Sequence, residues 1–138
     1  MDRKHRGACL CNRVQFEVEG NFDSFFLCYC EHCRKDTGSA HAANLFSRSA
    51  TLNWLKGRES VRTYRLDKTQ HSKSFCLNCG SALPTHDEHL NLLVVPSGSL
   101  DTAVDIKPDA RIFLGSKAEW VDKLDCIPGF DTLPQLER

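Results

Sequence analysis

Residues 74–83 read Ser-Phe-Cys-Leu-Asn-Cys-Gly-Ser-Ala-Leu and contain two cysteines, Cys76 and Cys79, the second directly before a glycine. Two thiolates at this spacing can hold one tetrahedral zinc ion, and glycine lets the backbone turn tightly around the metal. Such a pair needs two more ligands, and Cys9 and Cys11 near the N-terminus are the obvious source. The sequence therefore predicts a structural zinc site that joins the two halves of the chain.

The alternative for Cys76 and Cys79 is a redox pair of the thioredoxin type. We disfavour it because the flanking sequence lacks the βαβ pattern that accompanies such motifs. A structural zinc can contribute on the order of 10–16 kcal/mol of apparent folding free energy, which exceeds the net stability of most domains. Zinc is favoured over other thiophilic metals by the softness of thiolate ligands and by its preference for tetrahedral geometry.

The bulk composition predicts a single cytoplasmic domain, residues 1–138. Lysine plus arginine equal aspartate plus glutamate at 18 each, a balance that argues against nucleic-acid binding and against attachment to anionic membranes. No apolar run is long enough for a membrane helix, and no apolar signal region follows the first residues. Because thiols stay reduced in the cytoplasm, the eight cysteines are better explained as metal ligands or redox groups than as disulfides.

Short stretches of strand-type sequence dominate the chain and predict a mainly β fold. Val14, Phe16 and Val18 alternate with polar residues, which is the period-2 pattern of a half-buried strand. Residues 34–39 are expected to form a polar loop or a single helical turn. Further strands, separated by glycine and proline, are expected at residues 25–28, 40–46, 52–55, 61–66, 90–95 and 112–114.

The C-terminal part of the chain and the tryptophans are expected to serve packing. Residues 116–124 are predicted to form a short helix whose Trp120 and Val121 face inward. Trp54, like Trp120, is expected to anchor the core rather than to stack on a ligand. Cys126 stands apart from the other cysteines and is expected to be a small, partly buried apolar residue.

A further group of thiols, Cys28-x-Cys30-x-x-Cys33, has no evident fourth ligand. Three protein ligands and one open position form the arrangement of a catalytic or ligand-binding zinc. In such a site an incoming thiol is bound as thiolate. Two other interpretations remain open from the spacing alone. In the first, the group is a thiol site without permanent metal. In the second, it is a structural zinc site completed by a histidine such as His32.

Two basic residues, Arg34 and Lys35, follow the third thiol of this group. Ordinary surface charge is one explanation for such a pair. Their position also allows them to attract a carboxylate on a ligand bound at the three cysteines.

The motifs occur in a fixed order along the chain: Gly7-x-Cys9-x-Cys11, Cys28-x-Cys30-x-x-Cys33-Arg34-Lys35-x-Thr37-Gly38, Phe75-Cys76-x-x-Cys79-Gly80, and Ile112-Phe113-x-x-x-Lys117-x-x-Trp120 with Leu133-Pro134. Their order and spacing resemble the glutathione-dependent formaldehyde-activating enzyme family, which includes centromere protein V. The resemblance covers nearly the whole chain. It implies a mainly β, zinc-stabilised domain of short antiparallel strands with an Mss-four-like fold, which is shared with a small family of guanine-nucleotide exchange factors.

The resemblance also implies site residues and an activity. The structural zinc would be held by Cys9, Cys11, Cys76 and Cys79. A second, catalytic zinc would be held by Cys28, Cys30 and Cys33, beside the candidate ligand-binding residues Arg34 and Lys35. The reaction of the family is the condensation of formaldehyde with glutathione to S-hydroxymethylglutathione, which is named in reverse as a carbon–sulfur lyase reaction.

The leading hypothesis is therefore a zinc-dependent carbon–sulfur lyase that acts on a glutathione or other thiol adduct of formaldehyde or a related small aldehyde. Its partner would be that small thiol, with no role for nucleic acid or a membrane. The alternative is a non-catalytic zinc module, in which both cysteine clusters are structural and the protein binds another protein or a small thiol. A third possibility, a redox or metal-storage role, predicts a second cluster that oxidises or exchanges metal readily.

Overall fold

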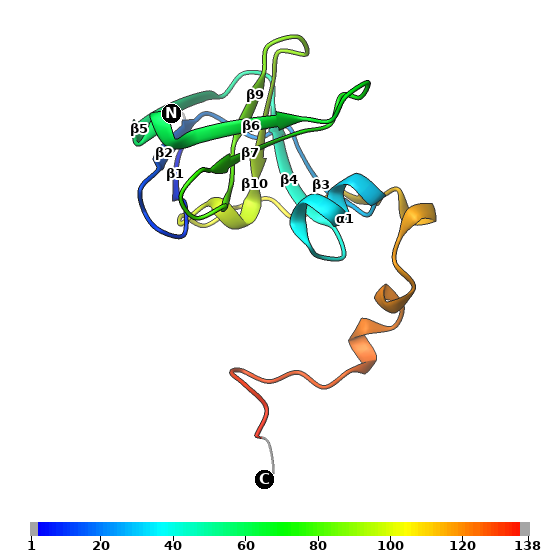
Figure 1. Ribbon diagram of the computed structural model, residues 1–138. Coiled ribbons are helices and arrows are strands. Elements are labelled where there is room, and N and C mark those ends of the chain that lie inside the picture. Colours follow the sequence, from blue (N-terminus) through cyan, green and yellow to red (C-terminus); the bar gives the residue numbers. More distant parts are fainter. Residues whose placement is uncertain (1–2, 136–138) are drawn as a thin grey trace.

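The computed structural model describes residues 3–135, which form three small sheets and one short helix, α1 (Glu31–Thr37), as Figure 1 shows. The first sheet is ordered β1 (Lys4–Ala8), β2 (Gln15–Glu19), β5 (Thr51–Lys56). The second is ordered β11 (Ala110–Ile112), β3 (Ser24–Cys28), β4 (Ala42–Ser47), β10 (Leu92–Pro96), β9 (Thr85–Asp87). The third is ordered β6 (Val61–Arg65), β7 (Ser72–Cys76), β8 (Ala82–Leu83). The predicted mainly β fold is confirmed.

Short 3₁₀ turns connect or follow the strands at Arg58–Ser60, Ser97–Ser99, Leu114–Ser116, Glu119–Val121 and Leu124–Cys126. Within residues 3–135 no helix has the length and apolar character needed to cross a membrane. Strand pairing organises the three sheets, and the α-helix of residues 3–135 lies at one end of the second sheet (Figure 1).

The alternating pattern of β2 forms the centre of the core. Phe16 and Val18 of β2 and the preceding Val14 are 0% exposed. The ring of Trp54 on β5 meets the Phe16 ring edge-on, with 6.0 Å between the ring centroids. Burial of a side chain such as Phe16 contributes on the order of 1.5–3 kcal/mol. The expectation that Trp54 anchors the core is confirmed, since it is partly buried against this cluster.

Five predicted strands, at 25–28, 40–46, 52–55, 61–66 and 90–95, correspond to β3, β4, β5, β6 and β10, with ends that differ by one or two residues. The sequence of β1 does not predict a strand, because it lacks an alternation of apolar and polar residues. Lys4 and Arg6 lie on one face and His5 and Gly7 on the other. It forms because it pairs with β2 along its whole length. Strand pairing supplied by a neighbour thus replaces a pattern that the segment itself lacks.

One strand pair departs from the antiparallel expectation. β11 pairs in parallel with β3, and Ile112 lies opposite Cys28. The predicted strand at 112–114 therefore ends two residues early, because Phe113 adopts a left-handed backbone conformation with φ of 58°. The Tyr29 amide extends the contact by donating a hydrogen bond to the carbonyl of Ile112 at 2.9 Å. This pairing holds the end of β3, where Cys28 lies.

The segment predicted as a loop or single turn at 34–39 belongs to a helix that begins earlier. α1 begins at Glu31, with Cys30 as its N-cap, and spans seven residues. It ends at Thr37 and is capped by Gly38, whose positive φ of 66° is easily adopted by glycine. The consequence is that Cys30 and Cys33 are positioned by a helical turn rather than by a flexible loop.

The prediction for residues 116–124 is wrong in its main feature. Separate 3₁₀ turns replace the expected helix. Val121 is buried at 9% exposure, as expected, but Trp120 is 61% exposed and does not anchor the core. Cys126 is exposed rather than partly buried. Figure 1 shows the chain moving away from the sheets along this segment, where Val121 still packs with Tyr29 and Ala40 while Trp120 stays exposed.

Candidate metal centres

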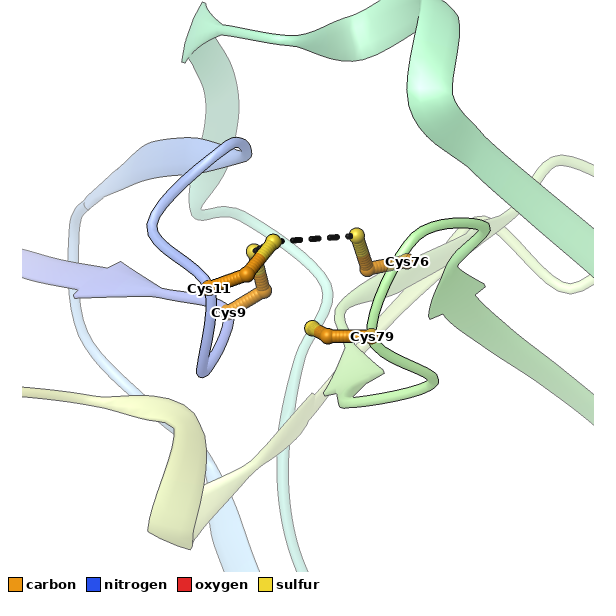
Figure 2. A group of neighbouring side chains, drawn as sticks. All are labelled: Cys9, Cys11, Cys76 and Cys79. Atoms are coloured by element: carbon orange, nitrogen blue, oxygen red, sulfur yellow. Dashed lines mark hydrogen bonds between the residues drawn. The ribbon is translucent and has the colours of Figure 1, made fainter.

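The four cysteines that were predicted to share a structural zinc lie together at one end of the molecule. Ligand atoms of Cys9, Cys11, Cys76 and Cys79 are all within 4.8 Å of one another. Figure 2 shows their side chains converging from two separate loops. The Sγ atoms of Cys9 and Cys11 are 3.6 Å apart, and those of Cys11 and Cys76 are 3.9 Å apart.

These distances fit a tetrahedral zinc site. With zinc–sulfur bonds of about 2.3 Å, tetrahedral geometry places two ligand sulfurs about 3.8 Å apart. A disulfide would need a sulfur–sulfur distance of about 2.0 Å, and all four residues are free thiols. The donor set of four thiolates is also one that structural zinc prefers. The group could therefore hold a metal ion of this kind without rearrangement of its loops.

A tight turn after β7 presents Cys76 and Cys79. Gly80 has a φ of 76°, a left-handed conformation that costs glycine little. The Gly80 amide donates to the Cys76 carbonyl at 2.7 Å, and the Cys76 amide donates to the Ser81 carbonyl at 3.0 Å. These backbone bonds close the turn and hold both thiols on its inner side, as the glycine in the motif predicted.

The N-terminal turn is shaped by a matching set of contacts. The amide of Asn12 donates to the carbonyl of Cys9 at 3.0 Å, and the amide of Val14 donates to Cys9 Sγ at 3.2 Å. The Leu10 amide donates to Ser81 Oγ at 2.8 Å, and that hydroxyl lies 3.2 Å from Cys79 Sγ. Ser81 thus joins the two loops directly, a role that the sequence analysis did not assign. The position of Ser81, two residues after Cys79, is the sequence feature from which this role could have been predicted.

The thiols of this group differ in acidity because their surroundings differ. Contact with the Ser81 hydroxyl, supported by the backbone N–H groups of Cys11 and Ser81, lowers the pKa of Cys79 to about 5. The side chain of Asn78 and the backbone N–H of Arg13 lower the pKa of Cys11. Burial instead raises the pKa of Cys9. Hydrogen bonds to sulfur therefore favour the thiolate form on the exposed side of the group.

The second predicted group, Cys28, Cys30 and Cys33, also comes together. Their ligand atoms lie within 4.8 Å of one another. Cys28 ends β3, Cys30 caps α1, and Cys33 lies in the first turn of that helix. The Cys33 amide donates to Cys30 Sγ at 3.4 Å. Among residues 3–135, no aspartate, glutamate, histidine or further cysteine joins these three as a fourth candidate ligand.

Burial separates the acidities of the three thiols. Burial raises the pKa of Cys33 far above its usual range and raises that of Cys28 as well. Burial also opposes ionisation of Cys30, but the N–H of Cys33 and the neighbouring thiols outweigh it, so that the pKa of Cys30 is lowered. A bound cation would reverse this balance, because metal coordination deprotonates thiols outright.

Two orphaned polar atoms lie close in sequence to the three-cysteine group. His41 Nδ1 and Arg34 Nε are buried and have no hydrogen-bond partner. The ring of His41 stacks at an angle on Tyr29, with 4.9 Å between centroids, and Tyr29 stands between Cys28 and Cys30 in the chain. Buried polar atoms without partners often mark a site that is completed by another component. No motif in the sequence marks His41.

Arg34 and Lys35 lie in different surroundings. Arg34 is partly buried, whereas Lys35 is exposed and lines a cavity of about 260 Å³ between α1 and β6. The cavity is also lined by Asp36 and Lys73, and Lys73 Nζ donates to the carbonyl of Asp36. Only Lys35 of the two predicted residues therefore reaches this cavity.

A histidine–aspartate pair lies in the same region and was also missed. His71 Nε2 is 2.6 Å from Asp36 Oδ2, and the ring of His32 lies 5.4 Å from the ring of His71. The two partners are distant in the sequence, so no local pattern could reveal the pair. The pair ties α1 to the loop that precedes β7.

Fold and site together define a small mainly β protein with two cysteine groups that could hold metal ions. A model of the glutathione-dependent formaldehyde-activating enzyme family matches residues 4–116, and the chain belongs to this family. A crystal structure of a Rhodobacter sphaeroides protein is similar, with 22% sequence identity and a TM-score of 0.57. The similarity covers 77% of this chain and 98% of that one, and it supports the fold alone.

Proposed function

We propose that the protein is a zinc-dependent enzyme acting on the carbon–sulfur bond between a small thiol and formaldehyde or a related small aldehyde. One zinc would be structural, held by Cys9, Cys11, Cys76 and Cys79, and a second would be held by Cys28, Cys30 and Cys33. The observation that carries the proposal is the three-thiol group without a fourth protein ligand among residues 3–135. Zinc bound there would act as a Lewis acid and template for the substrate sulfur.

The reaction needs no oxidant and no nucleophilic side chain. In the condensing direction a carbon–sulfur bond forms between the thiol and the aldehyde carbon, and the thiol proton passes to the carbonyl oxygen. The reverse reaction breaks the same bond and returns the proton to sulfur. Three thiolates already exceed the charge of one zinc ion, so its Lewis acidity would be modest. Orientation of the two reactants is then the main contribution expected of this site.

Residues around the three thiols support the binding of an anionic thiol such as glutathione, which has two carboxylates. Lys35 is exposed and directed to the cavity beside α1, where it can meet a carboxylate. Arg34 has a buried Nε without a partner, which a ligand oxygen would satisfy. Membership of the family supports glutathione as the first thiol to test.

The alternative function, a non-catalytic module that binds a protein or small thiol, is favoured by one observation. The buried, unpartnered Nδ1 of His41 lies on the ring that packs against Tyr29. If a rearrangement brought this nitrogen to the three thiols, His41 would be a fourth ligand and the site would be closed. Both cysteine groups would then be architectural.

Native mass spectrometry of the freshly purified protein, with and without glutathione, tests the proposal. Two zinc ions per chain, one of which is displaced or joined by glutathione, would support an open second site. Two zinc ions that ignore glutathione would favour the non-catalytic module, and a single zinc would refute the proposed second metal site. His41→Ala is the matched variant, because it removes zinc from a closed site and leaves zinc in an open one.

In a second assay, the rate of condensation of formaldehyde with thiols is measured and compared with the rate of the spontaneous reaction. The proposal predicts a rate above that background which is lost in Cys30→Ser. If no aldehyde and thiol pair exceeds the background, the enzymatic function is refuted.

A further inference from the structure

The C-terminal arm, residues 122–135, has no place in the fold of its own chain. Val121 is the last buried residue, held in a small cluster with Tyr29 and Ala40. Every residue from 122 to 135 is exposed. In Figure 1 this arm is the orange-to-red segment that runs away from the three sheets. The family match ends at residue 116, so the arm also lies outside the part shared with the family model.

The exposed residues of the arm include a regular apolar stripe. Leu124 is 41% exposed, Ile127 63%, Phe130 60% and Leu133 87%. They recur every third residue, Leu124 within the 3₁₀ turn Leu124–Cys126 and the other three in the irregular chain that follows it. Four exposed apolar side chains within so short a segment favour an interaction surface over a solvated tail.

A matching surface exists beside α1. The cavity between α1 and β6, which we call the α1–β6 groove, has Tyr64 and Leu66 among its walls. Tyr64 is 57% exposed and leaves its ring free for contact. Two lysines, Lys35 and Lys73, contribute positive charge to the groove. The groove therefore combines an aromatic side chain with two cationic side chains.

The charges of the arm and the groove are complementary. The arm contains three aspartates, at positions 122, 125 and 131, against the single Lys123. Asp122 is already paired with Lys117 at 2.6 Å, which leaves Asp125 and Asp131 to meet the groove. The acidic residue of the groove, Asp36, is already engaged by His71 at 2.6 Å. An apolar, acidic arm thus matches an apolar groove with cationic side chains. Opposite charges of this kind fix the register of an association and speed its formation.

We propose that the arm of one chain docks in the α1–β6 groove of a second copy, and that the exchange is reciprocal. The arm extends away from its own body, so a second molecule covers the apolar stripe without refolding of the arm. A reciprocal exchange gives a closed twofold dimer, the commonest symmetry of soluble oligomers. The α1–β6 groove is also the cavity that Lys35 lines, so the docked arm and a ligand carboxylate would compete for Lys35.

Light scattering coupled to size-exclusion chromatography tests the dimer. The full chain is expected to elute as a dimer that dissociates only on dilution. The double variant Ile127→Ser/Phe130→Ser should raise the dissociation constant by about a hundredfold or more, since two buried apolar side chains are lost. Tyr64→Asp should weaken the dimer from the groove side. Leu90→Ser, which replaces an exposed apolar residue away from both surfaces, is the matched control and should leave the dimer intact.

Photo-crosslinking identifies the contact itself. A benzoylphenylalanine placed at position 130 of a mixture of light and nitrogen-15-labelled chains should crosslink between chains, to peptides from residues 62–73 or 32–36. A monomeric full chain would overturn the proposal, as would a dimer that survives Ile127→Ser/Phe130→Ser. Crosslinks that stay within one chain, or that map to another surface, would also overturn it. Circular dichroism and zinc content verify that each variant is folded.

Discussion

Replacement of Cys79 by serine should destabilise the whole domain, because it weakens a metal link between distant parts of the chain. Cys11 and Cys76, whose Sγ atoms are 3.9 Å apart, are separated by 65 residues. By the chain-entropy relation for a cross-link, closing a loop of that length stabilises the folded state by about 4 kcal/mol. That is a large share of the roughly 5–15 kcal/mol by which native domains are stable. The side chain of Cys79 is only partly buried, so serine there removes a ligand with little loss of packing.

The same relation gives a smaller effect at the second group. Cys28 and Cys33 enclose a loop of only a few residues, whose closure is worth about 2 kcal/mol. Cys30→Ser should therefore retain the fold while it abolishes glutathione binding. For Cys79→Ser, by contrast, the expected loss of about 4 kcal/mol in the free energy of unfolding corresponds to a fall in melting temperature of about 12 °C or more.

Thermal unfolding followed by circular dichroism, with zinc measured in the same samples, is the assay. Cys126→Ser is the matched control, since this exposed cysteine belongs to neither group and its replacement should change neither melting temperature nor zinc content. Equal destabilisation by Cys30→Ser and Cys79→Ser would refute the division into one structural and one functional site. An unchanged melting temperature in Cys79→Ser would refute the structural role of the first site.

Ser81→Ala removes the acceptor of the Leu10 amide and should cost about 1 kcal/mol of unfolding free energy, measured by urea denaturation; no change would mean that water replaces the hydroxyl. Lys35→Gln should weaken glutathione binding about two- to fivefold in titration calorimetry, as expected for an exposed ion pair, whereas equal weakening by the exposed Lys56→Gln would point to a nonspecific charge effect.

Much of the fold could be predicted because it follows from local patterns. The alternation of Val14, Phe16 and Val18 identified a central strand whose inward residues are fully buried. No local pattern predicted that β11 pairs in parallel with β3, because the direction of pairing depends on where a distant segment enters the sheet. The inward orientation predicted for Trp120 failed for a similar reason. An aromatic side chain is buried only where another element covers it, and none does so at this point of the described chain.

The cysteine groups show the same division. Their spacing is a property of neighbouring residues, and the sequence by itself therefore determined which thiols belong to each group and that glycine must follow Cys79. Contacts between distant segments depend on how the sheets pack, and only the tertiary structure decided them. It brought Ser81 to the Leu10 amide, separated Lys35 from Arg34, and paired His71 with Asp36. It also left the C-terminal arm exposed, because burial is a property of the assembled chain and is not encoded in any single stretch of residues.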